Sequence, residues 1–447
     1  MEQVKSKDFK ITLPYSSRIK LKITPQKVAL FGVILFIYCM LFYYMRTLQL
    51  RLDFYSFYAS VLAYLEGLNP YKAIIATFLP NSVVVPENLN PPFFLQLISP
   101  LAHLNIKTAS SIWFGISLIS GIWGALLSLH LISPTAYFNQ HWLTYLCIYL
   151  AMYSTLMNTS YNQIGGILLF FVTAGYYFFL RHRDYWAGIF WGIIIAIKLF
   201  PALLFIFAFS QKRYKLMASM LLTVLLACLW PLLVRGPDIY VLYFKMILNI
   251  PWQGGNWNAS ISGFLFRLCT LDYARQHLFI IKIIYLCVSL VLLAWYIKKI
   301  NFLCYSSERH RAFCLTLTLM VLMSPMGWLY YFSLLLMPLT FLWHAVNHVP
   351  KISLLWIICL FLINAPLPYI SSHDMDPFIY KISLHSLYFY GVLLMVYLLA
   401  HYPEPPKDEM KIAHKENVYP VIISTSLALG LFTVLYNLIS HWHNVIT

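Results

Sequence analysis

The sequence predicts an all-α integral membrane protein, and three observations lead to this fold class. Of the 447 residues, 61% are hydrophobic and only 10% are charged, whereas a soluble domain carries about 25% charged residues. Several apolar runs reach the roughly 17–25 residues that a transmembrane helix needs. The clearest of these runs are 28–48, 109–132, 278–296 and 418–440. Basic residues gather at the ends of such runs, as the positive-inside rule expects.

The basic clusters define the predicted topology. The first 27 residues carry seven lysines and arginines against Glu2 and Asp8, so the N-terminus is expected in the cytoplasm. The apolar run that follows is too long for a cleaved signal peptide, and no small-residue cleavage site comes after it. Residues 91–103 are short and open with two prolines, and a crossing there would move the later basic clusters outside. We therefore expect this segment to lie in the membrane interface, inside one long outer loop from 49 to 108.

This topology predicts a helical bundle with about 13 transmembrane helices and an outer C-terminus. The predicted spans are 28–48, 109–132, 141–157, 164–181, 185–197, 201–211, 214–234, 278–297, 312–323, 328–344, 352–365, 383–400 and 418–440. Several are shorter than a full span, and broken helices at membrane depth are tolerated only around protein or a water-filled cavity. The functional site is therefore expected at an outward-facing cavity.

The domain prediction follows from the same pattern. A cytoplasmic basic segment, 1–27, precedes one polytopic domain over 28–400. A polar, proline-bearing cytoplasmic linker, 401–417, then leads to a final transmembrane helix and outer C-terminus at 418–447.

Several other function classes are not supported. The net charge of +16 does not indicate nucleic-acid binding, because no basic helix is interleaved with aromatic residues that stack on bases. The eight cysteines match neither a disulfide framework nor a zinc ligand set. Asp374 and Asp376 form an acidic pair of a kind that can hold a divalent metal, but the pattern is weak and favours a solvated loop. The sequence therefore requires no cofactor and no metal.

Asp53, just beyond the first span, is the main candidate for a catalytic group. Aromatic residues surround it, Tyr58 among them. Partial desolvation raises the basicity of a carboxylate, as a general base requires. The alternative is an interfacial aspartate that pairs with Arg51 inside an aromatic belt.

Lys198 and Gln163 are candidates on the short central helices. Lys198 lies between two of these helices, where a cation suits a lipid phosphate, or else it snorkels to the interface. Gln163 stands beside Gly165-Gly166 at a helix start, where it is expected to face the cavity.

The outer loop 235–277 contains a further group. Asn258 and Ser260 stand at the start of a predicted helix, where they can cap it and leave backbone N–H groups for an anion. Arg267 follows, and its guanidinium can bind a phosphate through two parallel bonds. The alternative is a capped helix with an arginine on its surface.

A third outer segment, 324–331, contains Trp328, Tyr330 and Tyr331. These aromatic residues fit a sugar-stacking pocket, and they fit the aromatic belt at a membrane interface equally well.

In chain order, these pieces resemble glycosyltransferase family 87, the polyprenyl-phosphate-sugar-dependent mannosyltransferases with the GT-C fold. The resemblance covers roughly residues 50–345. Its elements are Asp53 with 67–71, the prolines of 90–92 and 99–101, Gln163, Ala187-Gly188, Lys198–Pro201 with Lys212-Arg213, Asn258–Ser260 with Arg267, and Ser324-Pro325-x-x-Trp328. The chain departs from the family at Asn162, where the family has glycine. It departs again at Tyr330 and Tyr331, where the family often has histidine.

The resemblance implies a membrane glycosyltransferase that acts on the extracytoplasmic face, with a bacterial inner membrane as the expected location. A hexose, mannose by family default, would pass with inversion from a polyprenyl-phosphate donor to a lipid or glycan acceptor. An acidic residue of the first outer loop is implied as catalytic base, which favours Asp53. Lys198 and Arg267 are then expected to bind the donor phosphate. The expected sugar and acceptor pocket consists of Tyr58, Gln163, Asn258, Ser260, Trp328, Tyr330 and Tyr331.

Other functions stay open at this point. Broken helices also occur in lipid or sugar transporters, which usually contain an internal repeat, and none is evident here. The missing histidine leaves room for a GT-C-like protein that binds lipid without catalysis. A polymerase or ligase that uses pyrophosphate-linked donors is a further alternative.

Overall fold

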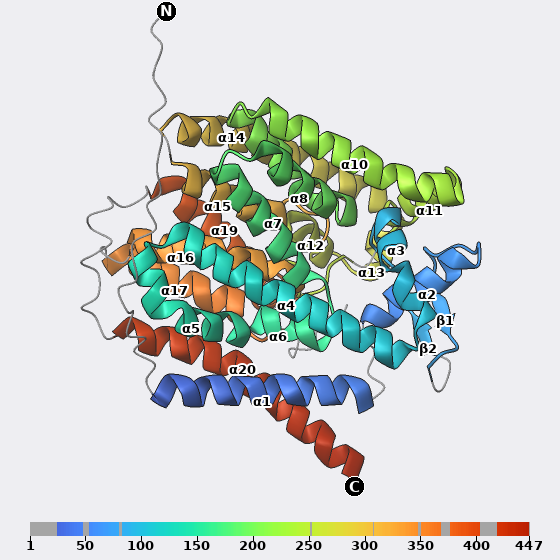
Figure 1. Cartoon of the computed structure of the whole chain (residues 1–447), viewed down its shortest axis with the longest axis horizontal. Coiled ribbons are helices and arrows are strands. Elements are labelled where there is room, and N and C mark those ends of the chain that lie inside the picture. Colours follow the sequence, from blue (N-terminus) through green and yellow to red (C-terminus); the bar gives the residue numbers. More distant parts are fainter. Residues whose placement is uncertain are drawn as a thin grey trace, which may run out of the picture.

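The structure, a computed structural model, describes residues 25–47, 53–79, 83–250, 253–306, 308–346, 350–367, 376–402 and 418–446. Within this part of the chain nearly all regular structure is helical (Figure 1), which confirms the predicted fold class in outline. The exception is a short antiparallel hairpin of β1 (Ile74–Ala76) and β2 (Val83–Val85), paired in register Ile74 with Val85. The sequence analysis did not predict this hairpin, because three-residue strands leave almost no periodic signal.

A helix lies over each predicted span. The long helices are α1 (Pro25–Thr47), α4 (Ile106–Ile132), α10 (Tyr214–Arg235), α14 (Leu278–Tyr305) and α20 (Val418–Ile446). The shorter ones are α5 (Thr135–Ala151), α6 (Tyr153–Ser160), α7 (Gly165–Leu180), α8 (Asp184–Ile197), α9 (Leu203–Ser210), α15 (Arg309–Leu322), α16 (Leu336–Val346), α17 (Pro350–Asn364) and α19 (Leu387–His401).

The connecting segments form further short helices. These are α2 (Asp53–Leu65), α3 (Pro92–Ile98), η1 (Ser99–His103), η2 (Phe200–Ala202), α11 (Asp238–Ile247), α12 (Ile261–Arg267), α13 (Leu271–Gln276), η3 (Leu329–Leu335), α18 (Phe378–Ile382) and η5 (Leu384–Ser386). The prolines at 91–92 therefore open a helix of seven residues, α3, which is far too short to cross a bilayer.

Among the described residues, five helical segments are long and apolar enough to cross a membrane. They are α1, α4, α10, α14 and the segment Phe378–His401. The predicted number of 13 spans is not confirmed, because the remaining apolar helices are shorter and some predicted spans are split. The span expected at 141–157, for example, is divided between α5 and α6 at Met152.

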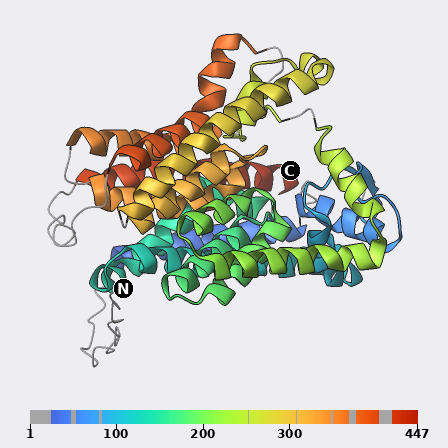
Figure 2. The same ribbon diagram turned by 90° about the horizontal axis from the view of Figure 1, so that it is seen from above.

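Exposed apolar surface supports an integral membrane protein. Helix α14 has a mean hydropathy of 2.5, yet only 6% of its most apolar window is buried inside the protein. Such a long exposed apolar surface is not stable in water, so lipid is its natural surrounding. Figure 2 shows α14 at the edge of one half of the bundle, with α19 beside it and α4 to α10 forming the other half.

The half formed by α4, α7, α8 and α10 is closely packed, because small residues lie at its helix contacts. A Cβ added at Gly188 or Gly192 of α8 would lie 2.4 Å from Ser219 Cβ or 2.5 Å from Thr223 Cβ of α10, respectively. Small residues that allow such close approach are typical of helix contacts in membranes.

Three turns between helices contain a non-glycine residue in the left-handed region: Asn162, His182 and Lys212, with φ of 55–58°. The turns at His182 and Lys212 belong to the basic clusters predicted to face the cytoplasm. Arg213 of the second turn forms an ion pair with Asp184 beside the first, so the starts of α8 and α10 are held together.

Candidate active site

Asp53 is the first residue of α2 in the structure. Position at a helix N-terminus favours a negative charge there. Helix α2 is almost completely buried, and its Phe54 ring stacks on Trp113 of α4 with the centroids 5.8 Å apart. The Tyr58 hydroxyl donates a 2.6 Å hydrogen bond to the Leu104 carbonyl. Tyr58 therefore fixes α2 to the segment after η1, and its contribution to a sugar pocket stays a prediction.

The Asp53 carboxylate accepts a hydrogen bond from Gln163. The distance from Gln163 Nε2 to Asp53 Oδ2 is 2.6 Å. Gln163 follows Asn162, whose carbonyl accepts from Trp113 Nε1 at 2.9 Å and whose amide donates to the Ser110 carbonyl at 2.9 Å. Two contacts with α4 thus hold the turn that carries Gln163.

The left-handed conformation of Asn162 explains a departure noted in the sequence. Its φ is 57°, a region that glycine adopts freely and that asparagine tolerates best among other residues. Asparagine can therefore replace the family's glycine here, and its side chain adds the contact with α4.

Lys198 is a second charged group that interacts with Asp53. It ends α8 in an extended conformation, with φ −145° and ψ 131°, and Pro201 in the following η2 prevents the helix from continuing. Its ammonium nitrogen lies 5.6 Å from the centroid of the Tyr331 ring. Lys198 and Asp53 attract each other, but they are not among the ion pairs of the described residues.

Burial changes the protonation of both groups. It raises the pKa of Asp53 to about 6, against the hydrogen bond from Gln163 and the charge of Lys198, which both lower it. Burial also lowers the pKa of Lys198 to about 7, against the charge of Asp53. The site therefore combines a carboxylate and an amine that both titrate close to neutral pH, which is typical of catalytic groups.

Helix η3 brings Tyr330 and Tyr331 to the same site. Both hydroxyl groups interact electrostatically with Asp53, and the Tyr330 hydroxyl is buried without a hydrogen-bond partner. A contact with α7 sets their position: a Cβ at Gly165 would lie 2.0 Å from the Tyr330 carbonyl oxygen, and Ser333 Oγ donates to the Gly165 carbonyl at 3.0 Å. Only glycine allows this approach.

Trp328 adjoins this group of residues through its contact with Tyr330. Its ring stacks with Tyr330 at 6.1 Å and meets Trp257 edge-on at 5.1 Å. Backbone bonds hold the two segments together, from Leu329 N to the Trp257 carbonyl and from Ala259 N to the Gly327 carbonyl, each 2.9 Å. Trp257 is an aromatic wall of the site that the sequence analysis missed, although it adjoins Asn258 in a segment that we singled out.

Asn258 and Ser260 are buried and bonded to protein. Asn258 Oδ1 accepts from Ser260 N at 3.1 Å and from Gly327 N at 2.9 Å, and its amide donates to the Gln253 carbonyl at 2.9 Å. Ser260 caps α12 by accepting from Gly263 N at 3.0 Å. The predicted helix cap is therefore confirmed, and these two side chains join the loop at 253–260 to the segment that carries Trp328.

Arg267 is buried, so the alternative of a surface arginine is wrong. Its guanidinium donates to the carbonyls of Gly255 and Asn258, at 2.6 and 3.0 Å, and to Ser386 Oγ at 3.1 Å. Burial lowers its pKa to about 10. Two of these hydrogen bonds thus hold the loop at 253–260 and the third joins it to Ser386, and the contact of Arg267 with a donor phosphate stays a prediction.

No metal site is evident in the part of the chain that the structure describes, since no three His, Cys, Asp or Glu side chains cluster there. Asp376 of the acidic pair bonds to His385 at 3.0 Å, whereas Asp374 lies outside the described residues.

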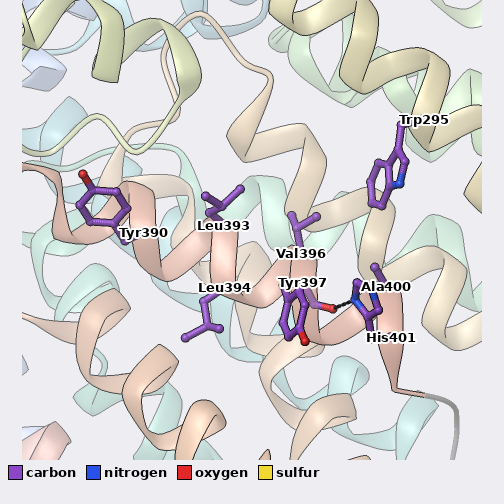
Figure 3. A pocket seen from close by; sticks show the side chains of 8 residues that line it. All are labelled: Trp295, Tyr390, Leu393, Leu394, Val396, Tyr397, Ala400 and His401. Carbon is purple, nitrogen blue, oxygen red and sulfur yellow. Dashed lines mark hydrogen bonds between the residues drawn. The ribbon is translucent and has the colours of Figure 1, made fainter. Parts of the chain in front are cut away.

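A groove of about 480 Å³ between α14 and α19 is separate from this site (Figure 3). Its lining consists of Trp295, Tyr390, Leu393, Leu394, Val396, Tyr397, Ala400 and His401. None of the predicted site residues contributes, and the mostly apolar lining offers little for catalysis.

Five of the predicted residues therefore meet at one place: Asp53, Gln163, Lys198, Tyr330 and Tyr331. Trp328 adjoins them through Tyr330, while the other four support the surrounding loops and helices. A buried carboxylate and a nearby cation that both titrate close to neutral pH, beside aromatic side chains, are features typical of an active site.

Comparison with known protein families identifies the family of this chain. The model of glycosyltransferase family 87 matches residues 88–325, more than half of the chain. The chain therefore belongs to glycosyltransferase family 87 and is a membrane glycosyltransferase. No curated protein and no solved structure matches it.

Proposed function

We propose that this glycosyltransferase moves a mannosyl residue from a polyprenyl-phosphate donor to a hydroxyl group of a lipid or glycan acceptor. Transfer takes place on the extracytoplasmic face of a bacterial inner membrane and inverts the anomeric configuration. The observation that carries the proposal is the hydrogen-bonded, desolvated Asp53 opposite Lys198.

Asp53 acts as the general base. A pKa of about 6 leaves it ionised at neutral pH while making it more basic than an ordinary aspartate. The carboxylate takes the proton of the acceptor hydroxyl, and that oxygen attacks the anomeric carbon. The bond from the anomeric carbon to the phosphate oxygen breaks, and polyprenyl phosphate leaves with the electron pair.

Lys198 stabilises the phosphate as it leaves. A cation fixed in a partly desolvated site interacts strongly with charge that develops in the transition state. In this mechanism the sugar lies between Lys198 and Asp53, which are not bonded to each other among the described residues. Tyr330, Tyr331 and Trp328 then line the sugar or acceptor side, and Arg267 contributes by holding the adjacent loop.

The test is transfer of labelled mannose from polyprenyl-phosphate-mannose into lipid extracts by purified protein. We expect transfer by the wild type and a loss of about 10²-fold or more in Asp53→Asn, because a general base contributes on that order. Asp238→Asn is the matched control, since Asp238 also begins a helix, α11, but is exposed.

Each other outcome has a definite meaning. Transfer that survives Asp53→Asn would retain the enzyme and remove Asp53 as its base. Absence of transfer with every donor sugar would contradict the proposal and favour a lipid-binding protein or a transporter, which uptake into proteoliposomes separates.

A further inference from the structure

Arg235, the last residue of α10, has no polar partner among the described residues. None of the hydrogen bonds and ion pairs in that part of the chain involves its guanidinium, and its Nε is buried without a partner. Glu66, the acidic residue next to the turn that Arg235 touches, forms no ion pair with it. An arginine without a counter-charge has unused capacity to bind an anion.

The guanidinium is nevertheless held in a defined position. Its central carbon lies 5.5 Å from the centroid of the Tyr64 ring. On another side it meets the turn after α2, where a Cβ at Gly67 would lie 3.1 Å from Arg235 Nη1. Gly67 has φ 82°, so the turn both favours glycine and leaves room for the guanidinium. Packing thus restricts Arg235 without using its N–H groups.

A second donor contacts the same tyrosine. The Tyr64 hydroxyl donates to Gln96 Oε1 at 2.8 Å. Its oxygen is used in this way, and none of the bonds among the described residues uses the amide nitrogen of Gln96. Two unused donors therefore flank Tyr64, and neither has an acceptor.

We propose that Arg235, Gln96 and Tyr64 form a second anion site, which binds an oxyanion of the phosphate class. A guanidinium presents N–H groups in a planar fork that matches such an oxyanion, and the Gln96 amide adds a neutral donor beside it. The ligand is the phosphate group either of the acceptor or of a membrane lipid, since α10 is a candidate membrane span that ends here.

The site is separate from the proposed donor phosphate. Tyr64 lies eleven residues along α2 from Asp53, which corresponds to about 16 Å at the rise of an α-helix. One phosphate cannot contact Lys198 and Arg235 at once over such a distance. The inference rests on the proposed function only for its biological meaning, because binding here requires no sugar transfer.

The experiment measures binding of inorganic phosphate to the full chain in phosphate-free detergent solution, by calorimetry or thermal shift. We expect saturable binding by the wild type, weakened about tenfold or more in Arg235→Gln, because hydrogen bonds to a charged group are lost. Arg181→Gln is the matched control, since Arg181 also packs on a tyrosine, Tyr177, at 4.2 Å. The control should bind as the wild type does.

A second variant guards against a folding defect. Gln96→Glu keeps an oxygen that accepts from Tyr64 and replaces the amide donor with a negative charge, next to the tyrosine on which Arg235 packs. We expect it to abolish phosphate binding while the protein stays folded. Titration of phosphatidylglycerol into the same detergent distinguishes the source: Arg235-dependent binding of phosphate without binding of the lipid points to an acceptor group, and Arg235-dependent binding of both points to a headgroup.

Equal binding of both probes by the wild type and Arg235→Gln would overturn the inference, as would an equal loss in Arg181→Gln. Failure of mannose transfer with intact Arg235-dependent binding would contradict the proposed function alone. The two proposals can therefore fail separately.

Discussion

Lys198 and Arg267 show how two cations with similar sequence contexts acquire different roles. Both follow or end short helices, and both were expected to bind the same phosphate. In the structure the ammonium of Lys198 has no hydrogen bond among the described residues and faces Asp53, whereas the guanidinium of Arg267 is bonded to two carbonyls and a hydroxyl. The comparison teaches that the bonds a cation makes within the protein, more than its charge, decide whether its N–H groups stay available.

The strongest test of this comparison is Lys198→Met. We expect transfer activity to fall about 10²-fold or more, because an electrostatic contact to the leaving group is lost. The unfolding temperature in detergent should change little, since no described hydrogen bond depends on the ammonium. Wild-type activity in this variant would show that Lys198 does not bind the phosphate.

Arg267→Met, in contrast to Lys198→Met, should lower the stability of the protein. Two carbonyl groups and Ser386 lose their donor, so we expect the free energy of unfolding to fall by about 3 kcal/mol. Thermal unfolding in detergent measures this loss. An unchanged unfolding temperature combined with weaker donor binding would return Arg267 to the phosphate site.

The pH profile sharpens the role of Lys198. Asp53 must be ionised, which gives an acid limb near pH 6, and Lys198 must be protonated, which gives an alkaline limb near pH 7. The rate constant kcat/KM should therefore follow a narrow bell between these limbs. Lys198→Arg should remove the alkaline limb, because arginine stays protonated. A limb that persists near pH 7 would assign it to another group.

The smallest expected effect concerns Gln163→Leu. Its hydrogen bond lowers the pKa of Asp53, so its loss should raise that pKa and move the acid limb to higher pH. Well above this limb, activity should stay within about tenfold of the wild type, because the base itself is retained. Gln211→Leu is a suitable control, since Gln211 bonds to Cys304 through its own amide at 2.6 Å. A limb that does not move would indicate that Gln163 holds the substrate instead.

The helices were predictable from the sequence because long apolar runs bounded by basic residues have few alternatives in a bilayer. The central site was only partly predictable. Asp53 and Gln163 are 110 residues apart and meet because their neighbours Phe54 and Asn162 both contact Trp113 of α4, which no local pattern encodes. The sequence singled out both residues, but chemistry alone favoured an interfacial aspartate at 53, and only the resemblance to a family favoured Asp53 as the base.

Other features could not be predicted because they depend on distant partners. Arg267 bonds to Ser386, 119 residues away, so its burial was invisible in its own segment. Trp257 acquires its place by pairing with the segment at 328–329. Similarly, the need for glycine at 165 arises only when η3 packs on α7.

Helices α8 and α10 begin next to each other but differ in length, and this difference bears on the depth of the proposed reaction in the bilayer. The ion pair of Arg213 with Asp184 holds the two helix starts together, and the helices then run side by side. Helix α10 has 22 residues and α8 has 14, which gives lengths of about 33 and 21 Å. Lys198 therefore lies about 12 Å short of the level at which α10 ends. Helix α10 is long and apolar enough to cross a membrane, so the proposed mechanism requires the sugar of a lipid-linked donor to reach Lys198 well below the end of this helix.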